Sequence, residues 1–241
     1  NASCVISSLD LAIKLVENGE AAALITNPIQ KSALRSAGFR EPGHTEYLAK
    51  ATNARNKPVM MLSGPELRVV PVTIHMPLIE AARSLNTDDI IHCSVVTAVA
   101  LKQYFNIADP RLTIAGLNPH AGENGLFGDQ ELKLITPAID KIREKGIRVH
   151  GPSPADTIFH SEARKNYDAV ICMYHDQALI PLKMLDFYKS VNITLGLSII
   201  RTSPDHGTAL DTAGKGIADP RSFIEAVHVA STMALSDNIF N

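Results

Sequence analysis

Short apolar runs alternate along most of the chain with segments whose apolar residues recur every three or four positions. An apolar run of about four to eight residues is typical of a buried strand, and the longer spacing is typical of an amphipathic helix. The pattern therefore predicts an α/β protein. The predicted strands are Ala21–Thr26, Val59–Leu62, Leu67–Thr73, Arg111–Ala115, Gly146–His150, Ala169–Met173 and Ile193–Leu197. The predicted helices are Ser7–Glu17, Ile29–Ala37, Glu46–Thr52, Leu78–Ser84, Ile90–Tyr104, Asp129–Lys145 and Ser222–Leu235.

Turn residues refine this outline. The segment Ser63–Glu66 between two strands suits a hairpin. Asp156 follows a Pro-rich turn and is placed to cap a short helix. Pro181 is expected to break the helix that Asp176 opens, because proline lacks the N–H that a helix interior needs. The segment Arg201–Pro220 is predicted to be a loop.

The stretch Gly116–Gly128 (GLNPHAGENGLFG) is the main candidate for a functional loop. It contains four glycines in thirteen residues and lies between a predicted buried strand and a predicted helix. The apolar positions of that helix are Leu132, Ile135, Ala138, Ile139 and Ile142. Open α/β sheets bind ligands in such loops, beyond the carboxyl ends of their strands. A long surface loop with glycines for tight turns is the alternative, but loops of this length in compact domains are usually functional.

Three histidines share one placement. His75, His120 and His175 each follow a strand-like run within a few residues, and the carboxyl ends of parallel strands line one edge of a sheet. For any one of them, an ordinary polar side chain at a strand end is the simpler interpretation. Three together, with Glu123 and Asp176 nearby, favour a site for zinc or a similar divalent ion.

Lys183, Asn192 and Arg201 lie near the ends of the later strands. Such a set would suit an anionic substrate, since arginine binds a phosphate or carboxylate through two parallel hydrogen bonds. Ordinary surface charges are the alternative.

Bulk properties exclude several classes of protein. A net charge of −2 and a pI near 6.5 give no sign of a nucleic-acid or membrane partner. No apolar stretch reaches membrane-spanning length and no signal peptide opens the chain, which favours the cytoplasm. The three cysteines are far apart and fit no disulfide or zinc-ribbon spacing.

The segment Asp205–Pro220 reads DHGTALDTAGKGIADP. It resembles the nucleotide-binding loop of the isocitrate and isopropylmalate dehydrogenase superfamily, in which glycines let the backbone approach the cofactor. The resemblance implies NAD or NADP as cofactor, with contacts at His206, Gly207, Thr208 and Asp211.

Further motifs narrow the resemblance. They read GHTEYL, IHMPL, GLNPHAGENG, GPSPADT, MYHDQALIPLK and VNITLGLSIIRTS. Together they are similar to the 4-hydroxythreonine-4-phosphate dehydrogenase family of vitamin B6 biosynthesis, over nearly the whole chain.

That family implies a divalent metal, zinc first and magnesium or cobalt as alternatives, held by His75, His120 and His175 with ligands from both subunits of a homodimer. It implies substrate contacts at His44, Thr45, Lys183, Asn192 and Arg201. Its fold is two α/β/α domains around a central cleft. Residues 1–44 and 191–241 would form the first, cofactor-side domain, and residues 45–190 the second, with the metal site and the dimer interface.

The implied reaction is metal-dependent, NAD(P)-linked oxidation of 4-phosphohydroxy-L-threonine to 2-amino-3-oxo-4-phosphooxybutanoate, which decarboxylates to 3-amino-2-oxopropyl phosphate. Relatives that oxidise 4-phosphoerythronate or 4-phosphothreonate would carry the same motifs, and a metal-dependent hydrolase is the other alternative. No general base is identified; Asp176 and Lys183 are candidates only by their place in the sequence. Family members begin with a strand and a Gly/Pro-rich loop upstream of Asn1, so we expect the first domain to be incomplete at its N-terminus.

Overall fold

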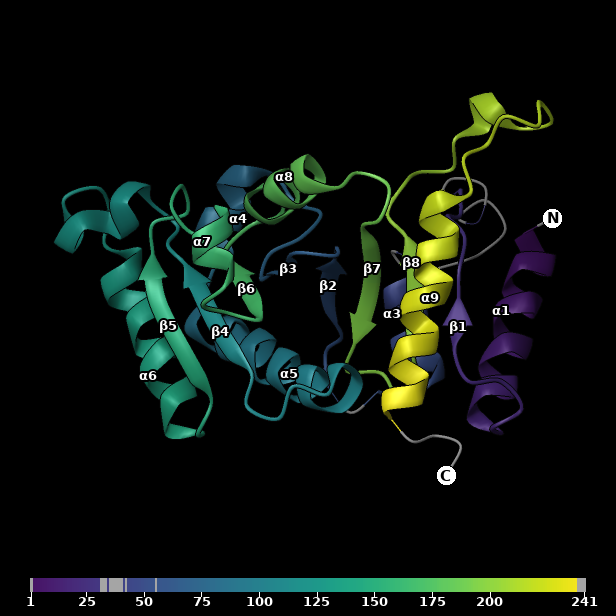
Figure 1. Ribbon diagram of the computed structural model, residues 1–241, viewed down its shortest axis with the longest axis horizontal. Helices are drawn as coiled ribbons and strands as arrows, with labels where there is room; N and C mark the ends of the chain where they lie inside the picture. Colours follow the sequence, from purple (N-terminus) through teal and green to yellow (C-terminus); the bar gives the residue numbers. More distant parts are fainter. Residues whose placement is uncertain (1, 31–33, 35–40, 42, 55, 238–241) are drawn as a thin grey trace. The chain divides into compact units, whose positions relative to one another are not determined.

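The structure is a computed structural model that describes residues 2–30, 34, 41, 43–54 and 56–237. The chain forms two structural units, residues 1–58 with 188–241 (unit 1) and residues 59–187 (unit 2). The family resemblance predicts the corresponding boundaries at 44/45 and 190/191. Figure 1 shows strands and helices in both units, and the expected α/β class is confirmed.

The sheet of unit 2 contains five strands, in the spatial order β2 (Val59–Ser63), β3 (Arg68–Pro71), β6 (Ala169–Cys172), β4 (Arg111–Ala115) and β5 (Arg148–Ser153). β2 and β3 form the expected antiparallel hairpin. β3, β6, β4 and β5 pair in parallel, so their carboxyl ends lie at one edge of the sheet.

Helices cover both faces of this sheet, because alternate residues of a strand point to opposite faces. Ala169 of β6 packs in a cluster with Leu101 of α5 (Thr87–Phe105). Its neighbour Val170 packs in another cluster with Leu182 of α8 (His175–Leu185). Burial on both faces explains the continuous apolar runs from which the strands were predicted.

The remaining helices of unit 2 are α4 (Leu78–Ser84), α6 (Thr136–Glu144) and α7 (Ser161–Arg164). α6 runs along the edge strand β5 (Figure 1). One turn of π-helix, Glu131–Ile135, precedes α6. This turn shifts the register of the helix face: Leu132, predicted to be on the apolar face, is 52% exposed, whereas Glu131 is 2% exposed.

Unit 1 contains β7 (Val191–Leu195), β8 (Arg201–Pro204) and β1 (Leu24–Ile25), with β8 antiparallel to β7 and parallel to β1. The α-helices among its described residues are α1 (Ala2–Glu17), α3 (His44–Ala51) and α9 (Arg221–Ser236). The side chains of Tyr47 on α3 and Asp10 on α1 form a hydrogen bond. Burial and this bond raise the pKa of Tyr47 to about 12.

Three expectations from the sequence were wrong, and one predicted strand has different bounds. Residues 201–204, expected in a loop, form the buried strand β8, while the preceding strand ends at Leu195. Pro181 lies inside α8 without ending it, in a helix anchored by buried leucines. Asp156 lies in a turn, and His160 caps α7 instead. The predicted strand Gly146–His150 continues to Ser153, since β5 is an edge strand and an edge tolerates proline.

The predicted helix Ile29–Ala37 and the expected loop before α3 fall mostly outside the described residues. Cys93 of α5 and Cys172 of β6 are buried free thiols, and burial raises the pKa of Cys172. Cys4 is exposed.

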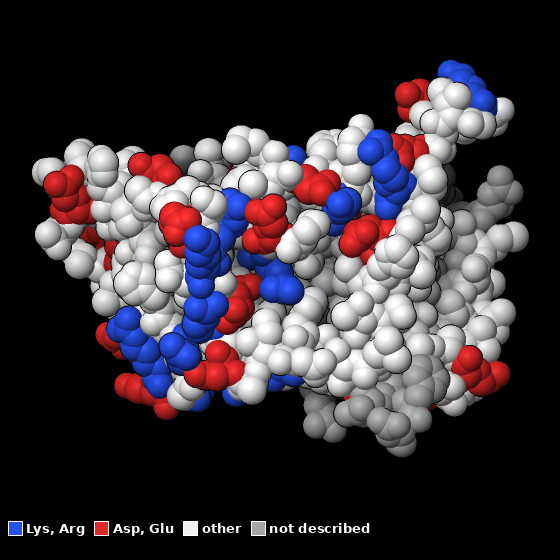
Figure 2. All heavy atoms as spheres, in the orientation of Figure 1, with Lys and Arg blue, Asp and Glu red and all other residues white. Residues whose placement is uncertain are grey.

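Acidic and basic side chains are interspersed on the face that Figure 2 shows, as the small net charge suggests. Among the helices that the structure describes, none combines the length and apolar character needed to cross a lipid bilayer.

Candidate functional site

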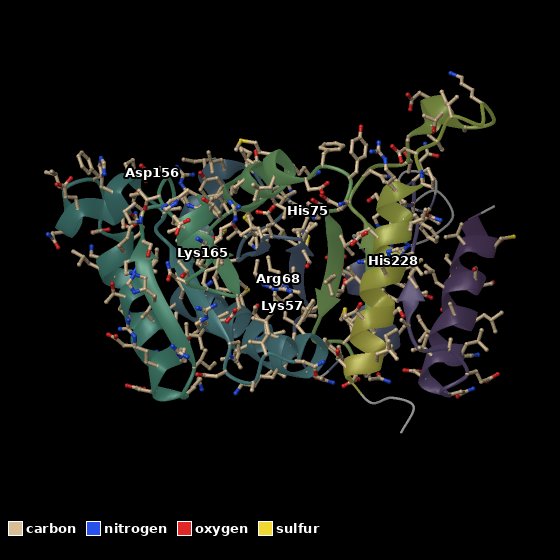
Figure 3. The ribbon with its side chains drawn as sticks, in the orientation of Figure 1. Lys57, Arg68, His75, Asp156, Lys165 and His228 are labelled. Atoms are coloured by element: carbon tan, nitrogen blue, oxygen red, sulfur yellow. The ribbon has the colours of Figure 1, made fainter. Side chains whose placement is uncertain are left out.

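His75 and His175 are carried to one place by two neighbouring strands. β3 and β6 stay paired beyond their last residues, because the Val72 amide donates to the Cys172 carbonyl at 2.8 Å. The Thr73 hydroxyl then donates to the Met173 carbonyl at 2.8 Å. The chain leaves both strands at the same edge, and the two imidazole centroids are 5.8 Å apart. Figure 3 shows His75 on the side of unit 2 toward which the arrow of β5 points.

Asp176 orients the ring of His175. Its Oδ1 lies 2.7 Å from Nδ1 of His175. A carboxylate accepts hydrogen bonds, so in the neutral imidazole Nδ1 carries the proton and Nε2 keeps its lone pair. A histidine whose other nitrogen is held by a carboxylate is the usual form of a metal ligand in proteins.

These residues line a pocket of about 410 Å³ in unit 2. Its wall includes His75, His175, Asp176 and the first residues of α4, with Tyr174 at the start of α8. The pocket has the size of a small-molecule site and combines apolar walls with a few polar groups.

His120 lies in the Gly-rich loop, whose backbone is unusual. Residues 120–124 all have positive φ, from 41° at Glu123 to 78° at Gly122. Four of these five residues carry a Cβ, and an L-residue in this region costs roughly 1–2 kcal/mol. Strained backbone is commonly found at functional sites, where the surrounding structure holds it in place. His120 is exposed, and its ring lies 5.8 Å from that of Phe127.

The carboxylate of Glu131 lies beneath this loop. Oε1 accepts the backbone amides of Leu117 at 2.8 Å and Asn118 at 2.7 Å. Oε2 accepts the side-chain amide of Asn118 at 2.9 Å. Glu131 is not among the site residues predicted from the sequence, although a signal was present. It lies four residues before Ile135, on the buried face of the helix, where a charged residue needs a partner.

The three histidines are not brought to one point within a single chain. In the part of the chain that the structure describes, no three His, Cys, Asp or Glu side chains could hold one metal ion together. His75 and His175 line the pocket, whereas His120 is not among its lining residues. The donor chemistry still fits a divalent ion, since two imidazoles face the same pocket and one is oriented by a carboxylate.

The residues expected to bind substrate fall in both units. His44 and Thr45 begin α3 in unit 1, where helix N–H groups favour an anion. Asn192 lies on β7, opposite Ser203 of β8. Lys183 lies on α8 of unit 2, on the same helix as His175, and its ammonium is 5.5 Å from the centre of the Phe187 ring.

Arg201 opens β8 and is 4% exposed. Its guanidinium donates to the hydroxyl of Thr26 from Nε at 3.2 Å and from a terminal nitrogen at 2.7 Å. The other terminal nitrogen donates to the hydroxyl of Thr194 at 2.9 Å. Burial lowers the pKa of Arg201 to about 10. Neutral hydroxyls do not balance its charge, so an anion close to Arg201 would be stabilised.

The expected cofactor loop is an exposed segment of unit 1. His206, Gly207, Thr208 and Asp211 all lie on it, and all four are exposed. Nδ1 of His206 is 2.8 Å from the Gly207 carbonyl. A Cβ built at Gly207 would meet no atom within 4 Å, so the space beside this backbone is open.

Comparison with known proteins gives a consistent result. The family model described as "Pyridoxal phosphate biosynthetic protein PdxA" matches residues 1–230. The 4-hydroxythreonine-4-phosphate dehydrogenase of Caulobacter vibrioides is 52% identical over 95% of this chain and 71% of its own. That of Ruegeria sp. is 53% identical over 97% of this chain and 72% of its own. The crystal structure of the Klebsiella pneumoniae 4-hydroxythreonine-4-phosphate dehydrogenase matches with a TM-score of 0.90 at 42% identity, covering 97% of this chain and 71% of that one.

These matches confirm the resemblance and the fold class inferred from the sequence motifs. They extend over both units and include the loop that carries His120. The chain belongs to the family of the pyridoxal phosphate biosynthetic protein PdxA.

Proposed function

We propose that the protein oxidises 4-phosphohydroxy-L-threonine with NAD⁺ or NADP⁺ in a metal-dependent reaction. The product would be 2-amino-3-oxo-4-phosphooxybutanoate, a β-keto acid that decarboxylates to 3-amino-2-oxopropyl phosphate. The relatives' name supplies the substrate. The observation that carries the chemistry is the pair of imidazoles, His75 and His175, at one pocket.

His75 and His175 would hold a divalent metal, with zinc as the first candidate. Their rings are 5.8 Å apart and face the same pocket, and Asp176 leaves Nε2 of His175 as the donor. When bound, such an ion supplies Lewis acidity to an alcohol or carbonyl oxygen.

The third ligand would be His120 of the partner subunit in a homodimer. A third donor from outside the chain agrees with the lack of any three-donor group among the described residues of one chain. The elements around the histidines also carry exposed apolar side chains. Ile79 on α4 is 57% exposed, Met184 on α8 is 82% exposed and Leu126 in the His120 loop is 71% exposed. Apolar surface of this kind is typical of a protein interface.

The substrate's anionic groups would be bound by cations and by helix N–H groups. Arg201 is buried beside two hydroxyls, and His44 and Thr45 lie at a helix N-terminus. Lys183 on α8 would supply a second cation, and Asn192 on β7 would supply an amide. Binding at several points orients the C–H bond of the reacting alcohol toward the nicotinamide. We propose the loop at His206, Gly207, Thr208 and Asp211 as the nicotinamide-nucleotide site.

The test is reduction of NAD⁺ and NADP⁺ by 4-phosphohydroxy-L-threonine, with Zn²⁺, Co²⁺ or Mg²⁺ added in separate reactions. We expect turnover in the unaltered protein, its loss in His75→Ala, and near-normal turnover in the matched control His150→Ala. His150 is an exposed histidine of β5 and does not line the His75 pocket. Turnover only with 4-phosphoerythronate or 4-phosphothreonate would keep the chemistry and change the substrate. Equal activity in His75→Ala and His150→Ala would contradict the metal site.

A further inference from the structure

Glu131 is a buried carboxylate dedicated to one loop. It is 2% exposed and accepts three N–H groups, two from the backbone at residues 117 and 118 and one from the Asn118 side chain. The Asn118 side-chain amide also donates to Oε1 of Gln130 at 2.8 Å. A buried charge is tolerated when donors of this kind replace water. All the donors to Glu131 lie two or three residues before His120.

The glycines of the loop leave room for this carboxylate. A Cβ at Gly122 would lie 2.6 Å from Oε2 of Glu131, and one at Gly116 would lie 3.2 Å from Oε1. A Cβ at Gly128 would lie 2.6 Å from Nδ2 of Asn118. Three glycines of the motif therefore pack around one carboxylate and its amide partner, so the loop is built around Glu131.

The loop needs such an anchor because its backbone is strained. His120 itself has φ 51° and ψ 29°, and the four residues after it also have positive φ. Backbone bonds within the loop are short-range turns, such as the Ala121 amide to the Asn118 carbonyl at 3.1 Å. The Glu131 carboxylate joins the loop to the helical segment that leads into α6.

Gln177 fixes the base of the same loop to the strand end that carries His175. Its Nε2 donates to the Gly116 carbonyl at 2.7 Å, and its Oε1 accepts the Met173 amide at 2.7 Å. Gln177 is buried and follows His175 by two residues on α8. The two histidine-bearing segments are thus connected through one side chain.

We infer that Glu131 is a positioning residue for His120: it holds the strained 116–128 loop so that the imidazole projects as a metal ligand. This inference rests on the proposed function, because it concerns a ligand of the proposed metal site. Glu131 touches neither the metal nor the substrate. Its effect is to keep the backbone that presents His120 in one conformation, on a base that Gln177 ties to the His175 segment.

The experiment compares Co²⁺ binding by the unaltered chain, Glu131→Gln, Asn118→Ala and Ile139→Val. Co²⁺ is titrated into the metal-free protein and followed by its visible absorption, which reports the ligands and their geometry. Glu131→Gln keeps the size of the side chain but turns an N–H donor toward the Asn118 amide. Ile139→Val is the matched control, because Ile139 is buried on α6, outside residues 116–128, and is not one of the donors to Glu131.

We expect Glu131→Gln to weaken Co²⁺ binding by roughly tenfold to a hundredfold and to alter the absorption band, as residues that orient metal ligands do. Asn118→Ala, which removes one of the three donors to Glu131, should weaken Co²⁺ binding by roughly threefold to tenfold. Ile139→Val should lower the melting temperature and leave the affinity unchanged. Hydrogen exchange of the metal-free proteins should accelerate within residues 116–128 in Glu131→Gln and not in Ile139→Val.

An unchanged Co²⁺ affinity and band in a folded Glu131→Gln protein would overturn the inference, even if exchange in the loop were faster. If Glu131→Gln does not fold, Asn118→Ala decides the question by the same two readouts. Failure of the unaltered chain to bind Co²⁺ or Zn²⁺ would instead contradict the proposed function itself. In that case the exchange data would still show whether Glu131 holds the loop.

Discussion

Replacing Gly122 by alanine is expected to destabilise unit 2 far more than the same change at Gly146. The two glycines have nearly the same backbone, with φ 78° and 75°. Alanine in this left-handed region costs roughly 1–2 kcal/mol at either position. A Cβ at Gly146 would meet no atom within 4 Å, so Gly146→Ala measures that backbone cost alone.

At Gly122 the added methyl group also meets Glu131. The Cβ would lie 2.6 Å from Oε2 and 2.9 Å from the Gly128 carbonyl oxygen, so the carboxylate must move. Weakening the bond between Oε2 and Asn118 costs about 1.5–3 kcal/mol, the usual range for a hydrogen bond to a charged group. The total for Gly122→Ala is therefore about 2.5–5 kcal/mol.

The assay is urea unfolding followed by circular dichroism, with both variants and the unaltered chain measured side by side. Repeating both substitutions in a Glu131→Ala background completes a double-mutant cycle. The excess cost at Gly122 should shrink there, with a coupling of roughly 1–3 kcal/mol. Equal costs for Gly122→Ala and Gly146→Ala, or an excess at Gly122 that is just as large without Glu131, would refute the packing argument.

Three further predictions concern other parts of the molecule. Burial acts to raise the pKa of Asp168, but hydrogen bonds from Arg111 outweigh it and hold that pKa below its ordinary value of 3.8. As the pH falls, Asp168 is therefore protonated first in the unfolded chain. The stability that it contributes is present above pH 3.8 and is lost as the pH drops through the lower pKa of the folded state. In thermal unfolding at neutral and acidic pH, Asp168→Asn should lose less stability on acidification than the unaltered chain does. Arg201→Lys should lower the free energy of unfolding by about 1–3 kcal/mol, because one ammonium cannot make all the hydrogen bonds that the guanidinium makes to two threonine hydroxyls. Unchanged thermal stability would show that these hydrogen bonds make no net contribution to stability. Phe127→Ser should shift the proposed dimer toward monomer in sedimentation velocity. Little thermal stability should be lost, since Phe127 is 46% exposed. A monomeric unaltered protein would contradict the dimer.

The apolar pattern was enough to predict β4, which is buried on both faces, at its observed bounds. The bounds of α4 were also predicted correctly, although most of that helix is exposed, and the hairpin of β2 and β3 followed from its turn residues. β8 was missed because its residues, Arg-Thr-Ser-Pro, are polar and read as a loop. Arg201 can be buried because it donates hydrogen bonds to the hydroxyls of Thr194 and Thr26 on other segments. Contacts between distant segments of this kind cannot be predicted from the sequence pattern.

The placement of the histidines at strand ends could be predicted, but their grouping could not. His75 and His175 lie close together because β3 and β6 are neighbours in the sheet, although about a hundred residues separate the two histidines in the sequence. An apolar pattern does not predict the order of strands in a sheet. His120 does not line the pocket of that pair. Its loop has a left-handed backbone at four non-glycine residues, a conformation that their residue types do not predict. The spacing of Glu131 to Ile135 was visible in the sequence, but the π-helical turn that buries Glu131 and exposes Leu132 was not.

The most direct test of the shared metal site is to mix two inactive variants, His120→Ala and His175→Ala, and measure metal-dependent NAD(P)⁺ reduction. If each site takes His75 and His175 from one subunit and His120 from the other, half of the sites in a mixed dimer are intact. Random exchange of subunits should then restore roughly a quarter of the unaltered activity, as expected for a two-fold dimer. No recovery in a mixture shown to contain mixed dimers, with each variant inactive alone, would contradict a metal site completed by the partner subunit.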